Sequence, residues 1–270
     1  MSCARSGAKG NALASFELRD EAQGKISPLA VGKGFLRHTL GPMRTWFISD
    51  THGYHDTLRV PADVHCVVHS GDATNAFDVA EAEREFAPFL TWFAGLDIAD
   101  KVFVAGNHDA WALRQNNRDA LRDAGVTYLQ DEAAEIGGVR FYGSPWTPTF
   151  GEWRFMKSRD KLSQLWDRIP ADCQVLVTHG PPLGILDLAD TRAGQAGQVV
   201  TVGDRALRRH VLTRVRPRVH AFGHVHDSRS GRCLNHGLRV VDDIRFVNAS
   251  CVTDGRWDEG VTSHGIVLEV

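Results

Sequence analysis

The sequence predicts an α/β protein, a four-layer α-β-β-α sandwich of two packed mixed sheets with a dinuclear metal site at the carboxyl edge of the strands. Three observations lead to this prediction. From Arg44 onward, short apolar runs alternate with segments of helical periodicity. The last third of the chain adds further strand-like runs, which favours a second sheet. Five of the runs end directly in motifs rich in Asp, His and Asn.

The five apolar runs predict buried strands, because each is short and bounded by Gly or polar residues. The runs are Thr45–Ser49, Val64–Ser70, Lys101–Ala105, Val175–Val177 and Val219–Phe222. The motifs that follow them are Asp50-Thr51-His52, Gly71-Asp72, Gly106-Asn107-His108-Asp109, Thr178-His179-Gly180 and Gly223-His224-Val225-His226. Each motif alone is commoner in turns than in metal sites, but all five in one order favour a single site at one sheet edge.

Between the strands, periodic apolar residues predict helices. Asp78–Gly95 has a stripe at spacings of three and four, and we expect Pro88 to kink or restart this helix. A second helix is expected over Ala110–Ala124, closed by Gly125. Two more are expected over Ser158–Arg168 and Gly203–Arg216. The arginines of the last segment lie opposite its apolar stripe, which favours a solvated face over a nucleic-acid surface.

The remaining apolar runs predict strands that complete the sheets. They are Val126–Leu129, Val139–Tyr142, Leu238–Asp242, Arg245–Asn248 and Gly265–Val270. Gly137-Gly138 is expected to form a turn. Residues 1–42 show no sustained period of 2 or 3.6, so we expect a poorly ordered N-terminal extension, followed by one domain over residues 43–270. The alternative is an ordered strap over that domain.

Composition narrows the choice of partners and compartment. A formal net charge of −2 gives no reason to expect polymeric nucleic acid or an anionic membrane as a partner. No apolar stretch is long enough to span a membrane, and no secretory signal is recognisable. The five cysteines lack metal-type spacing, so free thiols in a reducing compartment are favoured over disulfides. We therefore expect a cytoplasmic protein, whose oligomeric state the sequence leaves open.

The motifs carry the ligands that divalent cations prefer. A carboxylate can bridge two cations about 3.5–4 Å apart whereas an imidazole cannot, and Asp72 is the best candidate. Asp50 and His52 lie two residues apart and would face the same way on a regular strand, as would His224 and His226. The set contains nitrogen and oxygen ligands without thiolate. It therefore suits two divalent ions drawn from Mn, Fe, Zn and Co.

These motifs together resemble the pattern DxH, GD, GNH[D/E], H, GHxH of the calcineurin-like metallophosphoesterase superfamily. The resemblance covers residues 44 to about 270. Three further stretches are similar to its metallophosphoesterase-domain-containing branch, which includes brain-expressed animal proteins and bacterial relatives and is associated with phosphodiester hydrolysis. They are residues 142–148, 176–187 and 247–250.

The resemblance implies roles for nine residues. One metal would be held by Asp50, His52, Asp72 and His226, and the other by Asp72, Asn107, His179 and His224. His108 would bind the phosphate or protonate the leaving oxygen, and Asp109 would orient His108. The implied reaction is hydrolysis of a small phosphoester by attack of metal-bound hydroxide.

One departure from the family pattern concerns the substrate. The protein phosphatases of the family follow Gly-Asp with a run that supplies a phosphate-clamping Arg, whereas Ala73-Thr74-Asn75 stand here. We therefore expect small phosphodiesters, cyclic nucleotides among them. The alternatives are a phosphomonoesterase or protein phosphatase, and a low-activity metal-binding scaffold. Four aromatic residues form either a wall for a base or a hydrophobic loop cover: Trp146, Phe150, Trp153 and Phe155.

Overall fold

The computed structural model describes residues 41–76, 78–191, 198–254 and 259–270. Its first sheet has five strands, four of them mutually parallel. In spatial order they are β17 (Ile266–Glu269), β1 (Arg44–Ile48), β2 (Cys66–His69), β3 (Asp100–Phe103) and β4 (Thr127–Tyr128). Edge strand β17 runs antiparallel to β1.

The second sheet has six strands, of which the inner four are parallel and both edge strands antiparallel. In spatial order they are β14 (Gly237–Val241), β15 (Ile244–Asn248), β12 (Val219–Phe222), β9 (Val175–Thr178), β6 (Val139–Ser144) and β5 (Glu132–Ile136). All five strands predicted to carry motifs are therefore present, and both sheets are mixed.

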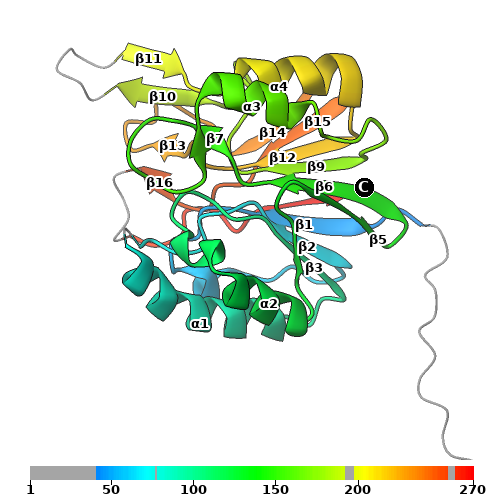
Figure 1. Cartoon of the computed structure of the whole chain (residues 1–270), viewed down its shortest axis with the longest axis vertical. Helices are drawn as coiled ribbons and strands as arrows, with labels where there is room; N and C mark the ends of the chain where they lie inside the picture. The colour runs from blue at the N-terminus through cyan, green and yellow to red at the C-terminus, as the bar shows by residue number, and fades with distance from the viewer. Residues whose placement is uncertain (1–40, 77, 192–197, 255–258) are drawn as a thin grey trace, which may run out of the picture. The chain divides into compact units, whose positions relative to one another are not determined.

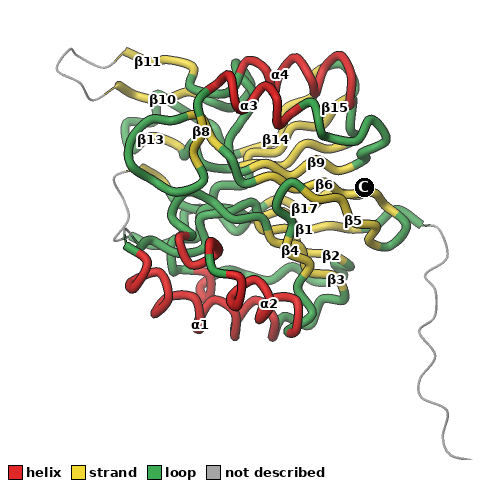
Figure 2. The backbone as a smooth tube through the Cα atoms, viewed as in Figure 1, coloured by secondary structure: helices red, strands yellow, loops and turns green. Residues whose placement is uncertain are grey.

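Four layers follow from where the apolar side chains are buried. Phe47, Val68 and Val177 belong to a core cluster between the two sheets. Helices α1 (Val79–Gly95) and α2 (Gln115–Asp123) cover the outer face of the first sheet, and α3 (Arg159–Trp166) and α4 (Arg205–His210) that of the second (Figure 1). Figure 2 shows the same order of helix, sheet, sheet and helix. The predicted α-β-β-α sandwich is confirmed.

Helix α1 begins where its sequence predicts. The Asp78 carboxylate accepts a hydrogen bond from the backbone N–H of Glu81, which caps the first turn. Phe86, Phe89 and other residues of the predicted stripe are buried against the first sheet. Pro88 lies inside the helix, which runs unbroken to Gly95. The expectation that Pro88 restarts the helix is wrong, because the flanking phenylalanines anchor both of its halves to the same core.

The single helix expected over residues 110–124 is divided in two. A 3₁₀ turn covers Ala110–Leu113, Arg114 is extended at φ −86° and ψ 129°, and α2 begins at Gln115. Fully buried Trp111 stacks against Phe86, so a tertiary contact overrides helical continuity here. The end of α2 is as predicted, with Gly125 at φ +79° donating its N–H to the Arg122 carbonyl oxygen.

Strand β5 was not predicted from the sequence. It forms a hairpin with β6 through Gly137 and Gly138, whose φ angles of +57° and +79° fit a type I′ turn. The strand escaped prediction because two of its five residues are Glu and only Ile136 is a buried apolar residue, as an exposed edge strand permits. The predicted turn at Gly137 and Gly138 is confirmed, and it connects β6 to the unpredicted strand β5.

Short elements complete the described chain. They are the 3₁₀ turn His55–Thr57, the π-helical turn Val211–Val215 after α4, and the ribbons β7 (Thr147–Pro148) with β8 (Met156–Lys157), β10 (Leu188–Thr191) with β11 (Gln198–Thr201), and β13 (Asp227–Ser228) with β16 (Thr253–Asp254). The arginine-rich face of residues 203–216 is only partly a solvated face. Arg208 and Arg214 donate to backbone carbonyl oxygens, whereas Arg205 and Arg209 are exposed.

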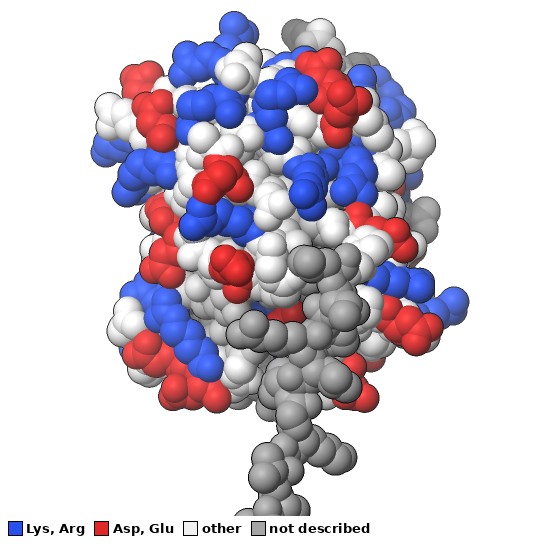
Figure 3. Space-filling model, turned by 90° about the vertical axis from the view of Figure 1, so that its right-hand side faces the viewer, with Lys and Arg blue, Asp and Glu red and all other residues white. Residues whose placement is uncertain are grey.

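Three compositional expectations can be compared with the structure. Cys66, Cys173, Cys233 and Cys251 are free and buried, as predicted, and Cys3 lies outside the described residues. Among the described helices, none has the length and apolarity needed to cross a bilayer. Positive and negative side chains are interspersed on the face shown in Figure 3. Of residues 1–42, predicted to form an extension, only Gly41 and Pro42 are described.

Candidate metal centre and active site

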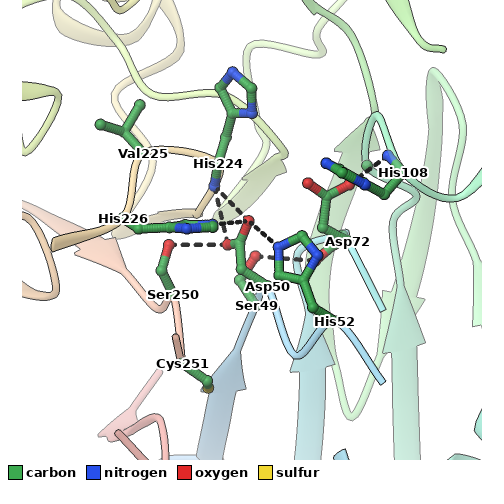
Figure 4. A network of polar contacts seen from close by, with 12 residues as sticks. Ser49, Asp50, His52, Asp72, His108, His224, Val225, His226, Ser250 and Cys251 are labelled. Carbon is green, nitrogen blue, oxygen red and sulfur yellow. Dashed lines mark hydrogen bonds and ion pairs between the residues drawn. The ribbon is translucent and has the colours of Figure 1, made fainter. Parts of the chain in front are cut away.

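The strand ends bring the predicted metal ligands together in two groups. Asp50, His52 and His226 offer ligand atoms that all lie within 4.8 Å of one another, and Asp72, His179 and His224 form an equivalent group. The parallel strands β1, β2, β9 and β12 deliver these residues to one edge of the sandwich (Figure 4). The two groups match the two ligand sets that the resemblance implied, apart from Asn107 and the second role of Asp72.

The backbone at these positions is unusual. Asp50, His52, Asp72 and His224 have φ angles of 52°, 44°, 55° and 68°, in the left-handed region that side chains other than Gly rarely adopt. Asp50 and His52 do face the same site, as expected, but the expected reason, a regular strand, is wrong. The strand ends before them, and left-handed residues turn both side chains into the site. Such backbone strain is typical of functional sites.

The first group is centred on the fully buried Asp50. Its Oδ1 lies 3.0 Å from His226 Nε2 and 4.0 Å from His52 Nε2. The backbone N–H of His224 and the hydroxyl of Ser250 donate to the same carboxylate, both at 2.9 Å to Oδ2. Burial alone raises the Asp50 pKa, but the His226 imidazole and its hydrogen bond hold that pKa well below the usual range. Asp50 is therefore ionised.

The second group is centred on Asp72 and His179. His179 Nε2 lies 3.2 Å from Asp72 Oδ2 and 3.0 Å from Asn107 Oδ1. On the other side of the ring, Nδ1 lies 2.9 Å from the carbonyl oxygen of Ser70. Asp72 also influences the first group, since its carboxylate is the charge that acts most strongly on His52. Asp72 is therefore close enough to the first group to act on it electrostatically, and its bridging role stays a prediction.

This donor set fits bound cations. The Ser70 carbonyl oxygen requires the hydrogen of neutral His179 to be on Nδ1, so the Nε2 lone pair faces two oxygens. Three acceptors around one point need a positive charge between them. Burial lowers the His179 pKa, but Asp72 outweighs this effect and raises it to about 9. A proton can therefore occupy the position that a metal would take.

The other three candidate ligand histidines also have pKa values shifted by burial and by neighbouring carboxylates. Burial lowers the His226 pKa, but Asp50 and then Asp254 raise it to about 10. Burial lowers the pKa of His52 and of His224 to about 3, which keeps both rings neutral and able to coordinate. With Asp50, Asp72 and Asn107, these groups are the mixed N/O ligands that suit Mn, Fe, Zn or Co.

His108 lies beside the ligands. Its backbone N–H donates to Asp72 Oδ1 at 2.7 Å, and its half-buried ring is centred 4.9 Å from the ring of His52. Figure 4 shows the His108 side chain beside the Asp72 carboxylate and the His224 side chain, apart from it, beside Asp50. An imidazole in this place can donate a proton to a group held above the carboxylates.

Asp109 has a different role from the one expected. Its fully buried carboxylate accepts hydrogen bonds from the backbone N–H groups of Asp72, Ala73, Thr74 and Gly106 and from the Thr74 hydroxyl. Burial and the Asp72 charge raise its pKa to about 7, and the hydrogen bonds oppose this shift. These donors fill its acceptor positions. We expected Asp109 to orient His108. Its contacts instead give Asp109 a positioning role, in which it joins the Asp72 loop to the Asn107 loop.

Two glycines of the motifs are required by close packing. A Cβ at Gly106 would collide with Asp72 Oδ1 and with the Asp72 backbone nitrogen. A Cβ at Gly223 would collide with Asp50 Oδ2 and the Ser49 side chain. Both glycines therefore let a backbone pass directly against a ligand carboxylate.

Sequence reasoning missed several residues that support the ligands. Ser250 binds Asp50, and Asp254 Oδ1 lies 3.2 Å from His226 Nδ1. Asn248 donates to the carbonyl oxygens of Val225 and Leu186, which holds the loop carrying the two histidines. Asn248 and Ser250 could have been found from the sequence, because they are polar residues at the end of an apolar strand, as the other site residues are. Asp254 had no such signal, because its proximity to His226 depends on the pairing of β13 with β16.

Comparison with known proteins agrees with this geometry. A family model described as calcineurin-like phosphoesterase matches residues 43–228. The human and mouse metallophosphoesterase domain-containing proteins 1 are each 31% identical over 231 residues, covering 76% of this chain and 65% of theirs. A UPF0046 protein of Caenorhabditis elegans is 32% identical over 219 residues, covering 75% of this chain and 73% of its own. This chain thus spans just under two thirds of the length of the two mammalian relatives.

A solved structure shows the same fold. The phosphopantetheinyl hydrolase of Mycobacterium tuberculosis superposes with a TM-score of 0.50 at 14% identity, covering 85% of this chain and 96% of that chain. The matched family segment contains the strand ends and both groups of candidate ligands described above. This chain belongs to the calcineurin-like phosphoesterase family.

Proposed function

We propose that this protein is a metal-dependent phosphodiesterase that hydrolyses small phosphodiesters, cyclic nucleotides among them. The observation that carries the proposal is the meeting of two largely buried donor groups, each with a carboxylate and two imidazoles, at one edge of the sandwich, where strands of both sheets end. Two divalent cations held there would supply Lewis acidity toward a phosphoryl oxygen and a nucleophile near neutral pH. The family to which the chain belongs performs metal-dependent phosphoester hydrolysis, which supports the proposal.

The protein's own residues have distinct parts in this proposal. Asp50, Asp72 and Asn107 are the oxygen ligands, and four imidazoles complete the two sets: His52, His179, His224 and His226. His108 donates a proton to the leaving oxygen. Its backbone N–H is fixed on Asp72 Oδ1, so the loop that carries His108 moves together with a ligand. This arrangement keeps a proton donor at a constant distance from the reacting group.

The preference for diesters rests on the loop after Asp72. The backbone N–H groups of Ala73 and Thr74 bind the Asp109 carboxylate, and the Thr74 hydroxyl donates to Asp109 and to the His108 carbonyl oxygen. These groups are engaged by Asp109 and His108, so the loop has no guanidinium where the protein phosphatases of the family supply one. A diester carries one negative charge and depends less on a cationic clamp than a doubly charged monoester does.

The test compares bis(4-nitrophenyl) phosphate with 4-nitrophenyl phosphate. The protein is stripped with a chelator and reloaded separately with Mn, Fe, Zn or Co, and kcat/KM is measured for both esters. We expect turnover only in reloaded protein and a higher kcat/KM for the diester. A higher value for the monoester would identify a phosphomonoesterase, and two bound metals without turnover of either ester would identify a metal-binding scaffold.

A further inference from the structure

The four aromatic residues between positions 146 and 155 divide into two pairs. Trp146 and Phe155 anchor the segment. Phe155 is buried, its ring is centred 5.5 Å from that of Trp146, and the Trp146 indole N–H donates to Asp131 Oδ2 at 2.8 Å. The Lys157 ammonium lies 3.8 Å from the centre of the Trp146 ring. This pair is a hydrophobic base for the loop, as one of the two sequence interpretations held.

The other pair, Phe150 and Trp153, lies against the active site. The Trp153 ring is centred 4.2 Å from that of His108, and the Phe150 ring 5.1 Å from that of His224. The backbone N–H of Arg154 donates to the carbonyl oxygen of Asn107, which ties the loop to a predicted ligand. Phe150 is 56% exposed although it touches the site. Phe150 therefore presents an exposed aromatic face directly beside His224, where a ligand in the site can reach it.

The placement of the two rings assigns each to one arm of a phosphodiester. The backbone N–H of His108 is bonded to the Asp72 carboxylate and that of His224 to the Asp50 carboxylate, so the two imidazoles stand beside different carboxylates (Figure 4). A phosphodiester held between them has a leaving arm and a retained arm. The leaving arm is the one that His108 protonates, so it lies beside Trp153, and the retained arm extends toward Phe150.

We propose that Trp153 and Phe150 are specificity-determining residues that stack on planar groups of the substrate, Trp153 on the leaving arm and Phe150 on the retained arm. The proposal rests on the phosphodiesterase function proposed above. The substrate class is then a phosphodiester that carries an aromatic ring, such as a nucleobase, on its leaving arm. Stacking of a base on an aromatic side chain corresponds to roughly 5- to 100-fold in binding or in kcat/KM.

The experiment uses metal-loaded protein and three diesters. The first has a methyl retained arm and a 4-nitrophenyl leaving group. The second has the same methyl arm and a fluoroalkyl leaving group chosen to match the pKa of 4-nitrophenol. The third is bis(4-nitrophenyl) phosphate. The variants Trp153→Leu and Phe150→Leu keep apolar bulk against the imidazoles and remove the aromatic face. Trp153→Phe tests rescue by a smaller ring.

We expect Trp153→Leu to lower the preference for the aryl over the fluoroalkyl leaving group by roughly 5- to 100-fold, mainly through kcat/KM of the aryl ester. Phe150→Leu is expected to lower the preference for the bis-aryl over the methyl aryl ester, and Trp153→Phe to restore most of the leaving-group preference. Leu238→Ala is the matched control, because it truncates an exposed apolar side chain on edge strand β14. All ratios should be unchanged in this control, and metal content should be unchanged in every variant.

Equal losses for aryl and fluoroalkyl esters in Trp153→Leu would overturn the proposal, since Trp153 would then only support the His108 ring. Loss of metal in Trp153→Leu but not in Trp153→Phe, with the aryl preference kept in the residual activity, would overturn it as well. If the unaltered protein hydrolyses no diester, both the specificity proposal and the proposed function fail. If it hydrolyses all three without a change of preference in the variants, the specificity proposal alone fails.

Discussion

Replacing Asp109 by Asn is expected to destabilise the fold and disturb the metal site, although the two side chains have nearly the same shape. The Asp109 Oδ2 accepts the N–H groups of Asp72 and Gly106, both at 2.8 Å, and Oδ1 accepts those of Ala73 and Thr74 at 3.1 Å. In the amide, one oxygen becomes an NH₂ group that faces these donors. The comparison is made at about pH 8, above the Asp109 pKa of about 7, so that the carboxylate is ionised. In either orientation of the amide, about two hydrogen bonds to a charged acceptor are then lost.

The size of the effect follows from those contacts. A hydrogen bond to a charged group contributes about 1.5–3 kcal/mol, so the loss of two lowers the free energy of unfolding by roughly 3–6 kcal/mol. This is a large share of the ~5–15 kcal/mol that stabilises a typical domain. Urea unfolding of metal-free Asp109→Asn, followed by tryptophan fluorescence, measures the loss. Elemental analysis of the reloaded variant measures its metal content, which we expect to fall because the Asp72 and Asn107 loops lose their connection.

Asp119→Asn is the matched control for this substitution. Asp119 is an exposed carboxylate on α2, so the same chemical change should alter the free energy of unfolding by no more than about 0.5 kcal/mol. One result would refute the reasoning. If Asp109→Asn keeps its stability and both metals but loses turnover, Asp109 acts on His108, as the family resemblance implied, and the positioning role is wrong.

Four further outcomes are expected. Asp72→Ala should lose both metals and all turnover, and one tight metal with appreciable turnover would contradict the bridging role. His108→Ala should lower turnover about 10²–10⁴-fold with metal content intact. That loss should be smaller for good leaving groups, and equal losses would assign His108 to phosphate positioning. Metal affinity, measured by calorimetry, should rise from about pH 6 to about pH 8. The reason is that metal-free His179 and His226, with pKa values of about 9 and about 10, hold protons that the metal displaces. An affinity independent of pH would contradict this account. A chain starting at Met43 should keep its melting temperature and metal-dependent turnover, and a fall in either would show that the preceding segment is part of the fold.

Much of the candidate site could be predicted from the sequence because the relevant signals are local. A short apolar run bounded by Gly and polar residues marks a buried strand wherever that strand lies in the sheet. The ends of β1, β2, β9 and β12 were therefore correctly placed. The carboxyl ends of parallel strands in one sheet share an edge, which brought Asp50 and Asp72 together, whereas His179 comes from the end of β9 in the second sheet.

The predictions that failed depended on contacts between distant segments. The break between residues 113 and 115 follows from the packing of Trp111 on Phe86, and the largely exposed strand β5 exists because β6 pairs with it. The chemistry of Asp109 suggested a partner next to it in sequence. Its donors come instead from the loop around Asp72, 37 residues earlier, because a buried carboxylate takes the nearest unsatisfied N–H groups in space.

The sequence by itself determined which strands carry motifs and, through the family resemblance, which residues are candidate ligands, because residue type and spacing encode these directly. Only the tertiary structure decided how the ligands turn into the site, since the left-handed backbone at Asp50, His52, Asp72 and His224 is imposed by its surroundings. It also decided which aromatic residues anchor the loop and which face the site. Side chains such as Phe150 and Phe155 are chemically identical, and only the groups packed around each one distinguish an exposed ring beside His224 from a buried ring beside Trp146.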